Sequence, residues 1–112
     1  MMHEMKLNDD PFKRIKEGTK KVELRLNDEK RQLVKKGDLI EFTNRETLEK
    51  ITTEVVDLYK YPSFAELYKH IDPLVMGYDA GDVVDPKDME QYYNKEEEEK
   101  YGVVGIKLIL KK

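Results

Sequence analysis

The sequence contains no cysteine among its 112 residues. Disulfide bonds and a thiol nucleophile are therefore excluded, and a reducing compartment is the natural environment for such a chain. Long apolar runs are missing too, since the longest is Val103-Val104-Gly105-Ile106, far too short for a transmembrane helix. Residues 1–6 hold no apolar stretch typical of a secretory signal. These absences lead us to expect a cytoplasmic protein with no membrane partner.

Histidine is scarce, with only His3 and His70 in the chain. The two residues lack the spacing of a metal-ligand pair, so we do not expect zinc. His3 begins a predicted strand and could face a cleft, although an exposed or structural role is the simpler interpretation. His70 ends a predicted helix, where a cation suits the carboxyl-terminal dipole. We therefore expect no metal, and we assign no cofactor because no Gly-rich turn joins a strand to a helix.

Charge is unevenly distributed along the chain. Residues 1–45 carry 12 Lys and Arg against 9 Asp and Glu, whereas residues 46–112 carry 9 against 15. The net charge of −3 and the pI near 5.5 argue against non-specific binding to duplex nucleic acid, because phosphate neutralisation needs a basic surface. A basic face on the first half stays possible, and an ordinary solvated surface is the alternative.

The length fits one domain with one core, and we predict a single domain over residues 1–112. Alternating and β-branched segments predict strands, and capping residues predict helices. The predicted strands cover residues 2–7, 21–26, 39–43, 51–59 and 103–110. The predicted helices cover residues 10–17 and 63–70, another starts at Asp85-Pro86, and short helical turns cover 27–34 and 95–100.

Strands dominate the middle of the chain and helices follow. This order predicts an α+β fold, with a mainly antiparallel sheet or small barrel and helices packed outside. The apolar start of the last strand predicts burial on both of its faces. Residues 71–85 read as one long irregular loop, and Gly77 and Gly81 would allow this loop to act as a lid.

The most informative segment runs from Gly18 to Arg25. Alternate side chains of a strand share a face, so Lys21, Glu23 and Arg25 are expected on one side, with Lys20 at the mouth of the strand. A carboxylate between cations stays ionised, and arginine offers a planar fork to a carboxylate, a phosphate or a nucleobase edge. A lysine crowded by arginine can lose its proton and act as a base. An exposed Glu–Arg pair of little energetic value is the alternative.

The segment is part of a longer pattern: Gly18-x-Lys20-x-x-Glu23-x-Arg25, then Lys36-Gly37-Asp38 before a strand, and Tyr101-Gly102-Val103-Val104-Gly105-Ile106 near the end. This pattern resembles the ASCH domain family over almost the whole chain. The resemblance implies a small, mainly antiparallel PUA-like β-barrel that binds RNA, a nucleotide or a nucleoside in a cleft beside the barrel. It also implies that Lys20, Glu23 and Arg25 line the cleft. Lys21, beside them, is a further candidate ligand-binding residue.

Some members of this family are amidohydrolases that deacetylate acetylcytidine with a lysine, a threonine and a glutamate. The resemblance makes Lys20 and Glu23 candidate catalytic residues, but Glu23 occupies the threonine position, so the hydroxyl nucleophile is missing. Thr19 precedes the lysine, and Asp79 and Asp82 are acidic candidates for the third residue that we leave unassigned.

Three hypotheses remain open. The first is an RNA- or nucleotide-binding module, and the second is a small amidohydrolase or nuclease that transfers protons through Lys20 and Glu23. In the third, the Glu–Arg pair only pins the strand to its neighbours.

Aromatic and acidic residues elsewhere have weaker signals. Tyr59, Tyr61 and Phe64 surround Pro62 and could stack on a base, although packing of a strand on the next helix is the simpler interpretation. Residues 96–99 are all glutamate and would repel RNA, so a nucleic-acid surface is expected elsewhere.

Overall fold

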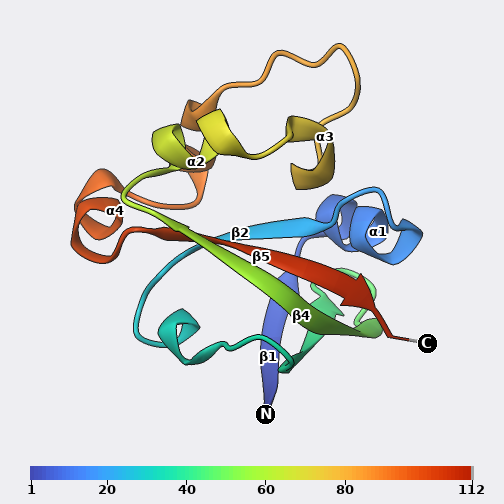
Figure 1. Ribbon diagram of the computed structural model, residues 1–112. Coiled ribbons are helices and arrows are strands. Elements are labelled where there is room, and N and C mark those ends of the chain that lie inside the picture. The colour runs from blue at the N-terminus through green and yellow to red at the C-terminus, as the bar shows by residue number, and fades with distance from the viewer. Residues whose placement is uncertain (112) are drawn as a thin grey trace.

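The computed structural model describes residues 1–111 as a curled five-stranded sheet with helices on its outside (Figure 1). The strands are β1 (Met2–Leu7), β2 (Val22–Leu26), β3 (Leu39–Asn44), β4 (Lys50–Tyr61) and β5 (Val103–Leu110). The helices are α1 (Asp9–Glu17), α2 (Phe64–His70), α3 (Pro73–Met76) and α4 (Lys95–Tyr101), together with the 3-10 helices η1 (Arg31–Leu33) and η2 (Pro86–Gln91). The predicted α+β class is confirmed.

The strand order in the sheet is β1-β3-β4-β5-β2. Among the strands of residues 1–111, β1 and β3 pair in parallel and the other three pairings are antiparallel. The long β4 carries a register shift between Val55 and Asp57, and an irregularity of this kind bends a strand and increases its twist. The sheet curls into a half-barrel that is compatible with a PUA-like barrel, and β1 and β2 are its two edges.

Two apolar clusters form the core. The first fills the inside of the half-barrel and includes Phe12 and Ile15 of α1, Ile40 and Phe42 of β3, and Val104, Ile106 and Leu108 of β5. The second lies between β2 and the helices α2 and α3, and includes Val22, Leu24, Leu26, Phe64, Leu67 and Met76. The alternation predicted for β2 is thus confirmed, because its apolar residues all turn toward the second cluster.

Helix α2 lies close to β5 because that strand carries a glycine. A Cβ atom on Gly105 would lie 3.5 Å from Cδ1 of Leu67 in α2 and 3.2 Å from Cδ1 of Ile71, which directly follows α2. The predicted burial of β5 on both faces is confirmed, since Val103 to Ile106 are all buried between β4 and β2.

The segment predicted as one irregular loop over residues 71–85 contains a short helix, α3. Pro73 lies in its first turn, and the Asp72 carboxylate accepts a 3.0 Å hydrogen bond from the backbone N–H of Leu74. Four residues are too few to show a helical period in the sequence, and the fold stabilises this turn by burying Met76. The helix starting at Asp85-Pro86 is the 3-10 helix η2.

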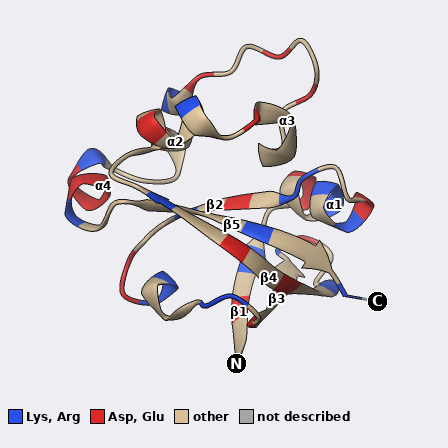
Figure 2. Cartoon of the chain, in the orientation of Figure 1, with Lys and Arg blue, Asp and Glu red and all other residues tan. Residues whose placement is uncertain are grey.

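Charges of both signs are spread over the chain, and α1 and α4 each carry both (Figure 2). Within residues 1–111, no helix is long and apolar enough to cross a membrane.

Candidate functional site

Lys20, Glu23 and Arg25 form a buried cluster at β2, which we call the triad. Oε1 of Glu23 lies 3.1 Å from Nζ of Lys20, and Oε2 accepts a 2.8 Å hydrogen bond from Nε of Arg25. The Glu23 side chain is 6% exposed, and those of Lys20 and Arg25 are each 11% exposed. Each carboxylate oxygen therefore has its own cationic partner, away from most of the solvent.

Glu23 and Arg25 are both ionised at neutral pH. Burial alone would raise the pKa of Glu23, but the charges of Lys20 and Arg25 outweigh it and hold that pKa below its ordinary value. For Arg25, burial would lower the pKa, and the Glu23 carboxylate outweighs burial and raises it. Glu23 is consequently a hydrogen-bond acceptor at neutral pH and a poor proton acceptor.

This arrangement predicts how stability depends on pH. Because the pKa of Glu23 is lower in the folded than in the unfolded chain, its ionisation stabilises the fold above the unfolded pKa, and this contribution is lost as the pH falls through the folded pKa. We expect Glu23→Gln to lower the Tm at neutral pH, and the difference from wild type to shrink below about pH 4. Thermal unfolding of both proteins over a pH series measures this difference in Tm.

The control for this series is Glu54→Gln, which removes the partner of Lys111 in an exposed ion pair. Its Tm should stay close to that of wild type throughout, because exposed pairs contribute little. A Tm difference for Glu23→Gln that is the same in acid and at neutral pH would contradict the pKa assignment.

The triad lies at the open seam of the half-barrel. Nη2 of Arg25, on the edge strand β2, donates a 2.9 Å hydrogen bond to the backbone carbonyl of Lys6, on the edge strand β1. A side chain held by Glu23 therefore joins the two sheet edges at this point, where a closed barrel would use backbone hydrogen bonds.

A cavity of about 330 Å³ opens beside this seam. Its charged lining comes from both edge strands, α1, the residues before β2, the turn after β3 and η2, and consists of Lys6, Asp10, Arg14, Lys20, Glu23, Arg25, Arg45 and Asp88. Its aromatic and thioether lining comes from α2, α3, η2 and the residues that follow α3 and η2, and includes Tyr68, Met76, Tyr78, Met89, Tyr92 and Tyr93. Charged hydrogen-bonding groups and flat apolar side chains thus line the same cavity.

The chain after α3 packs closely on the charged lining. Gly77 has a φ of 112°, and a Cβ atom there would lie 3.3 Å from Cδ of Lys20 and 3.9 Å from Cδ of Arg14. The absence of a side chain lets the backbone rest on both aliphatic stems. This contact holds the Lys20 ammonium toward Glu23, and it places part of the predicted lid, residues 71–85, in the cavity wall.

Three side chains form a polar group within the aromatic lining. The Tyr78 hydroxyl donates a 2.7 Å hydrogen bond to Oδ2 of Asp88 and lies 3.0 Å from the Tyr68 hydroxyl. Burial raises the pKa of Tyr78, and its bonds to Tyr68 and Asp88 raise it further. The hydroxyl therefore stays protonated, and it ties the segment after α3 to η2.

The predicted site residues separate into two groups. Lys20, Glu23 and Arg25 come together in the triad, whereas Lys21 is exposed and does not line the cavity. Thr19 is exposed as well, and its hydroxyl donates to the carbonyl of Arg14 at 3.3 Å. The structure therefore brings neither Lys21 nor Thr19 to the triad.

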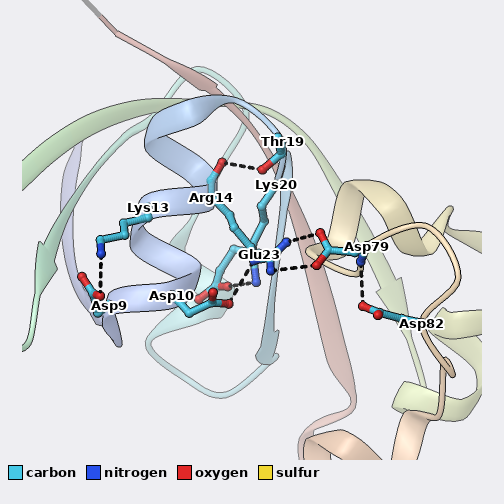
Figure 3. A network of polar contacts seen from close by, with 9 residues as sticks. All are labelled: Asp9, Asp10, Lys13, Arg14, Thr19, Lys20, Glu23, Asp79 and Asp82. Atoms are coloured by element: carbon cyan, nitrogen blue, oxygen red, sulfur yellow. Dashed lines mark hydrogen bonds and ion pairs between the residues drawn. The ribbon is translucent and has the colours of Figure 1, made fainter.

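The two acidic candidates lie on the segment after α3 (Figure 3). Asp79 contacts Nη1 and Nη2 of Arg14 at 2.7 and 3.2 Å, and Oδ2 of Asp82 accepts a 2.8 Å hydrogen bond from the Asp79 N–H. Asp79 thus pairs with a residue of the cavity lining, and Asp82 supports the turn that carries Asp79.

Sequence reasoning missed Arg14 and the tyrosines of the lining. Arg14 has no pattern of its own apart from its position shortly before the charged segment, and the spacing of Tyr92 and Tyr93 after Met89 is also that of ordinary packing residues on one helix face. The aromatic residues singled out instead lie elsewhere: Phe64 is buried and stacks on Tyr93 at 5.8 Å between ring centroids. Neither Phe64 nor Tyr59 nor Tyr61 lines the cavity at the triad.

The histidines lie outside the cavity lining. Nε2 of His3 is 2.9 Å from Oδ2 of Asp38, and the His70 ring stacks on Tyr61 at 5.2 Å. In the part of the chain that the structure describes, His, Asp and Glu side chains form no group of three or more suited to hold a metal ion.

Comparison with known proteins places the chain in a family. Its sequence matches the model of the ASCH domain over residues 5–112. Its structure is similar to the crystal structure of the hypothetical protein PH0355, with a TM-score of 0.79 and 34% identity over 99% of this chain and 100% of that chain.

A second similar structure is the solution NMR structure of protein PF0455 from Pyrococcus furiosus, with a TM-score of 0.70 and 31% identity over 98% of this chain and 97% of that chain. No curated protein matches the chain. The family model and both structures span nearly the whole sequence, and the chain belongs to the ASCH domain family.

Proposed function

We propose that the cavity at the triad binds a nucleotide-like ligand or single-stranded RNA. The observation that carries this proposal is the buried triad of ion-paired side chains next to tyrosine rings in one cavity of about 330 Å³. That volume is within the range of small-molecule sites, about 300–1,000 Å³. Membership of the ASCH domain family supports the same ligand class.

Each part of the lining suits one part of such a ligand. Tyr92, which is 56% exposed, offers a ring on which a base can stack. Glu23 can accept hydrogen bonds from an exocyclic amino group, while Lys20 and Arg25 can donate to base edges or phosphate oxygens. The triad is preorganised, because its charges already hold one another in place.

Single-stranded or monomeric ligands fit this protein better than duplex nucleic acid. The net charge is −3, and the glutamates of α4 add negative charge away from the cavity lining. Duplex binding relies on a broad basic surface that neutralises many phosphates, whereas a stacked base with a few charged contacts needs only a local site.

The geometry favours binding over hydrolysis or nuclease activity. Both oxygens of Glu23 are paired with cations, and the low pKa of this carboxyl makes it a weak general base. Thr19 lies outside the cavity lining, and its hydroxyl is bonded to the backbone carbonyl of Arg14. Acetylcytidine deacetylation that disappears in Lys20→Met would reverse this preference.

The proposal is tested by adding nucleosides, nucleotides and short single-stranded RNAs to the isotope-labelled protein and recording backbone amide shifts. We expect one ligand class to shift amides of residues 20–25, 76–78 and 88–93, which border the cavity. Free ribose is the control and should shift none of them. Absence of shifts with every ligand, or shifts confined to other surfaces, would refute nucleotide binding at this site.

A further inference from the structure

Arg14 is a cation of the cavity lining, and its guanidinium group is already hydrogen-bonded to carboxylates of this chain. It projects from α1 into the cavity that contains the triad, and its side chain is 26% exposed. Nε of Arg14 donates a 3.0 Å hydrogen bond to Asp10, while Nη1 and Nη2 donate to the two oxygens of Asp79 at 2.7 and 3.2 Å. Asp10 therefore orients the guanidinium, and Asp79 takes its two outward donors.

The Asp79 carboxylate has no other role in the local structure. The turn that carries it is closed by other bonds, because the Asp79 N–H donates to the Asp82 carboxylate at 2.8 Å and the Asp82 N–H donates to the Asp79 carbonyl at 3.1 Å. Within residues 1–111 the Asp79 carboxylate oxygens bond only to Arg14, which lowers the pKa of Asp79. Its side chain is 64% exposed, so it can leave Arg14 for water at little cost.

Arg14 and Lys20 stand beside each other in the lining. The backbone at Gly77 lies over both aliphatic stems, and Figure 3 shows the two side chains extending toward the same region as Glu23 and Asp79. A guanidinium fork binds a phosphate with the same two-point geometry that it uses for a carboxylate. A phosphate at the position of the Asp79 carboxylate would thus meet Arg14, with the ammonium of Lys20 nearby.

We propose that Arg14 is the phosphate-binding residue of the cavity and that Asp79 occupies its fork until a phosphate group replaces it. The proposal rests on the proposed function for the nucleoside part of the ligand, and it adds that the site prefers a phosphorylated ligand to a bare nucleoside. Asp79 acts as an internal competitor, so it weakens phosphate binding and leaves nucleoside binding unchanged.

Inorganic phosphate tests the competition at Arg14 without any nucleoside. The Nε–Hε resonance of Arg14 is followed by NMR during phosphate titrations of the wild type, Asp79→Asn and Glu49→Gln. Glu49→Gln is the matched control, because it removes a carboxylate from another exposed ion pair of α1, with Lys16, and changes the net charge equally. We expect Asp79→Asn to bind phosphate roughly threefold to fivefold more tightly than wild type, as the strength of an exposed ion pair allows. Equal affinities of Asp79→Asn and Glu49→Gln would overturn the proposal.

Cytidine and cytidine 5′-monophosphate extend the test to the whole ligand. We expect Arg14→Gln to lose most of the affinity gained from the 5′-phosphate and to bind cytidine like the wild type. A loss of equal factor for both ligands would refute a phosphate role for Arg14. If neither ligand binds the wild type while phosphate still competes with Asp79, the nucleotide function fails and the phosphate site stands. If Arg14 does not respond to phosphate, the phosphate site fails and nucleoside binding is unaffected.

Discussion

Arg25→Met is expected to lower the free energy of unfolding by about 3 kcal/mol, the lower end of the range for breaking a buried ion pair. The variant keeps an apolar stem in the same place but leaves the buried Glu23 carboxylate with Lys20 as its remaining cationic partner. It also removes the hydrogen bond from Nη2 to the Lys6 carbonyl, which joins the two edges of the sheet. Urea unfolding measures the change, with the slope expected to stay constant.

Two further variants sharpen this measurement. Arg45→Met removes an exposed arginine of the same cavity lining and should change stability by less than about 0.5 kcal/mol. Adding Glu23→Gln to Arg25→Met should restore roughly 1 kcal/mol, because the uncompensated buried charge is gone. A loss below about 1 kcal/mol for Arg25→Met alone would show that the pair contributes no more than a surface ion pair.

Because Arg25 stabilises the fold, its removal is a poor probe of binding, and Lys20→Met is a better one. We expect Lys20→Met to weaken binding of the tightest nucleotide by roughly tenfold to a hundredfold, since a charge-assisted hydrogen bond contributes about 1.5–3 kcal/mol. Methionine preserves the packing of the stem under Gly77 while removing the ammonium group beside Glu23. Isothermal titration calorimetry at fixed ionic strength measures the affinity.

The neighbouring Lys21 supplies the matched control. Lys21→Met makes the same substitution and the same charge change one residue away, but this side chain is exposed and lies outside the cavity lining. The affinity of Lys21→Met for the nucleotide should equal that of the wild type. Equal losses in both variants would mean that the ligand responds to general positive charge and that Lys21 belongs to the binding surface after all.

Short-range chemistry in the sequence was sufficient to predict most elements. Period-two alternation located β2, and the Ser63 cap located α2, where the Ser63 hydroxyl accepts a 3.1 Å hydrogen bond from the Glu66 N–H. The helix α3 escaped prediction because four residues give no period, and its stability comes from burial of Met76 against residues distant in the chain. Local signals thus identified elements wherever the stabilising partners were also local.

The same division applies to the candidate site. Lys20, Glu23 and Arg25 are close in sequence, so strand geometry and the family pattern were enough to predict that their side chains lie together. Strand alternation also grouped Lys21 with Glu23 and Arg25, because a period of two cannot reveal which neighbouring element covers which end of a strand. The fold covers Glu23 and leaves Lys21 in solvent.

The individual strands and helices and the charged cluster at β2 could be predicted from the sequence, since each depends on residues within a few positions of one another. The mainly antiparallel sheet was predicted from the order of strands and helices along the chain. The tertiary structure adds three features: this cluster is buried at the seam between β1 and β2, the tyrosines of α2 and of the segments after α3 and η2 share its cavity, and Asp79 holds Arg14. These contacts join residues far apart in the chain. Their formation depends on how the curled sheet and its helices pack, which no local pattern encodes.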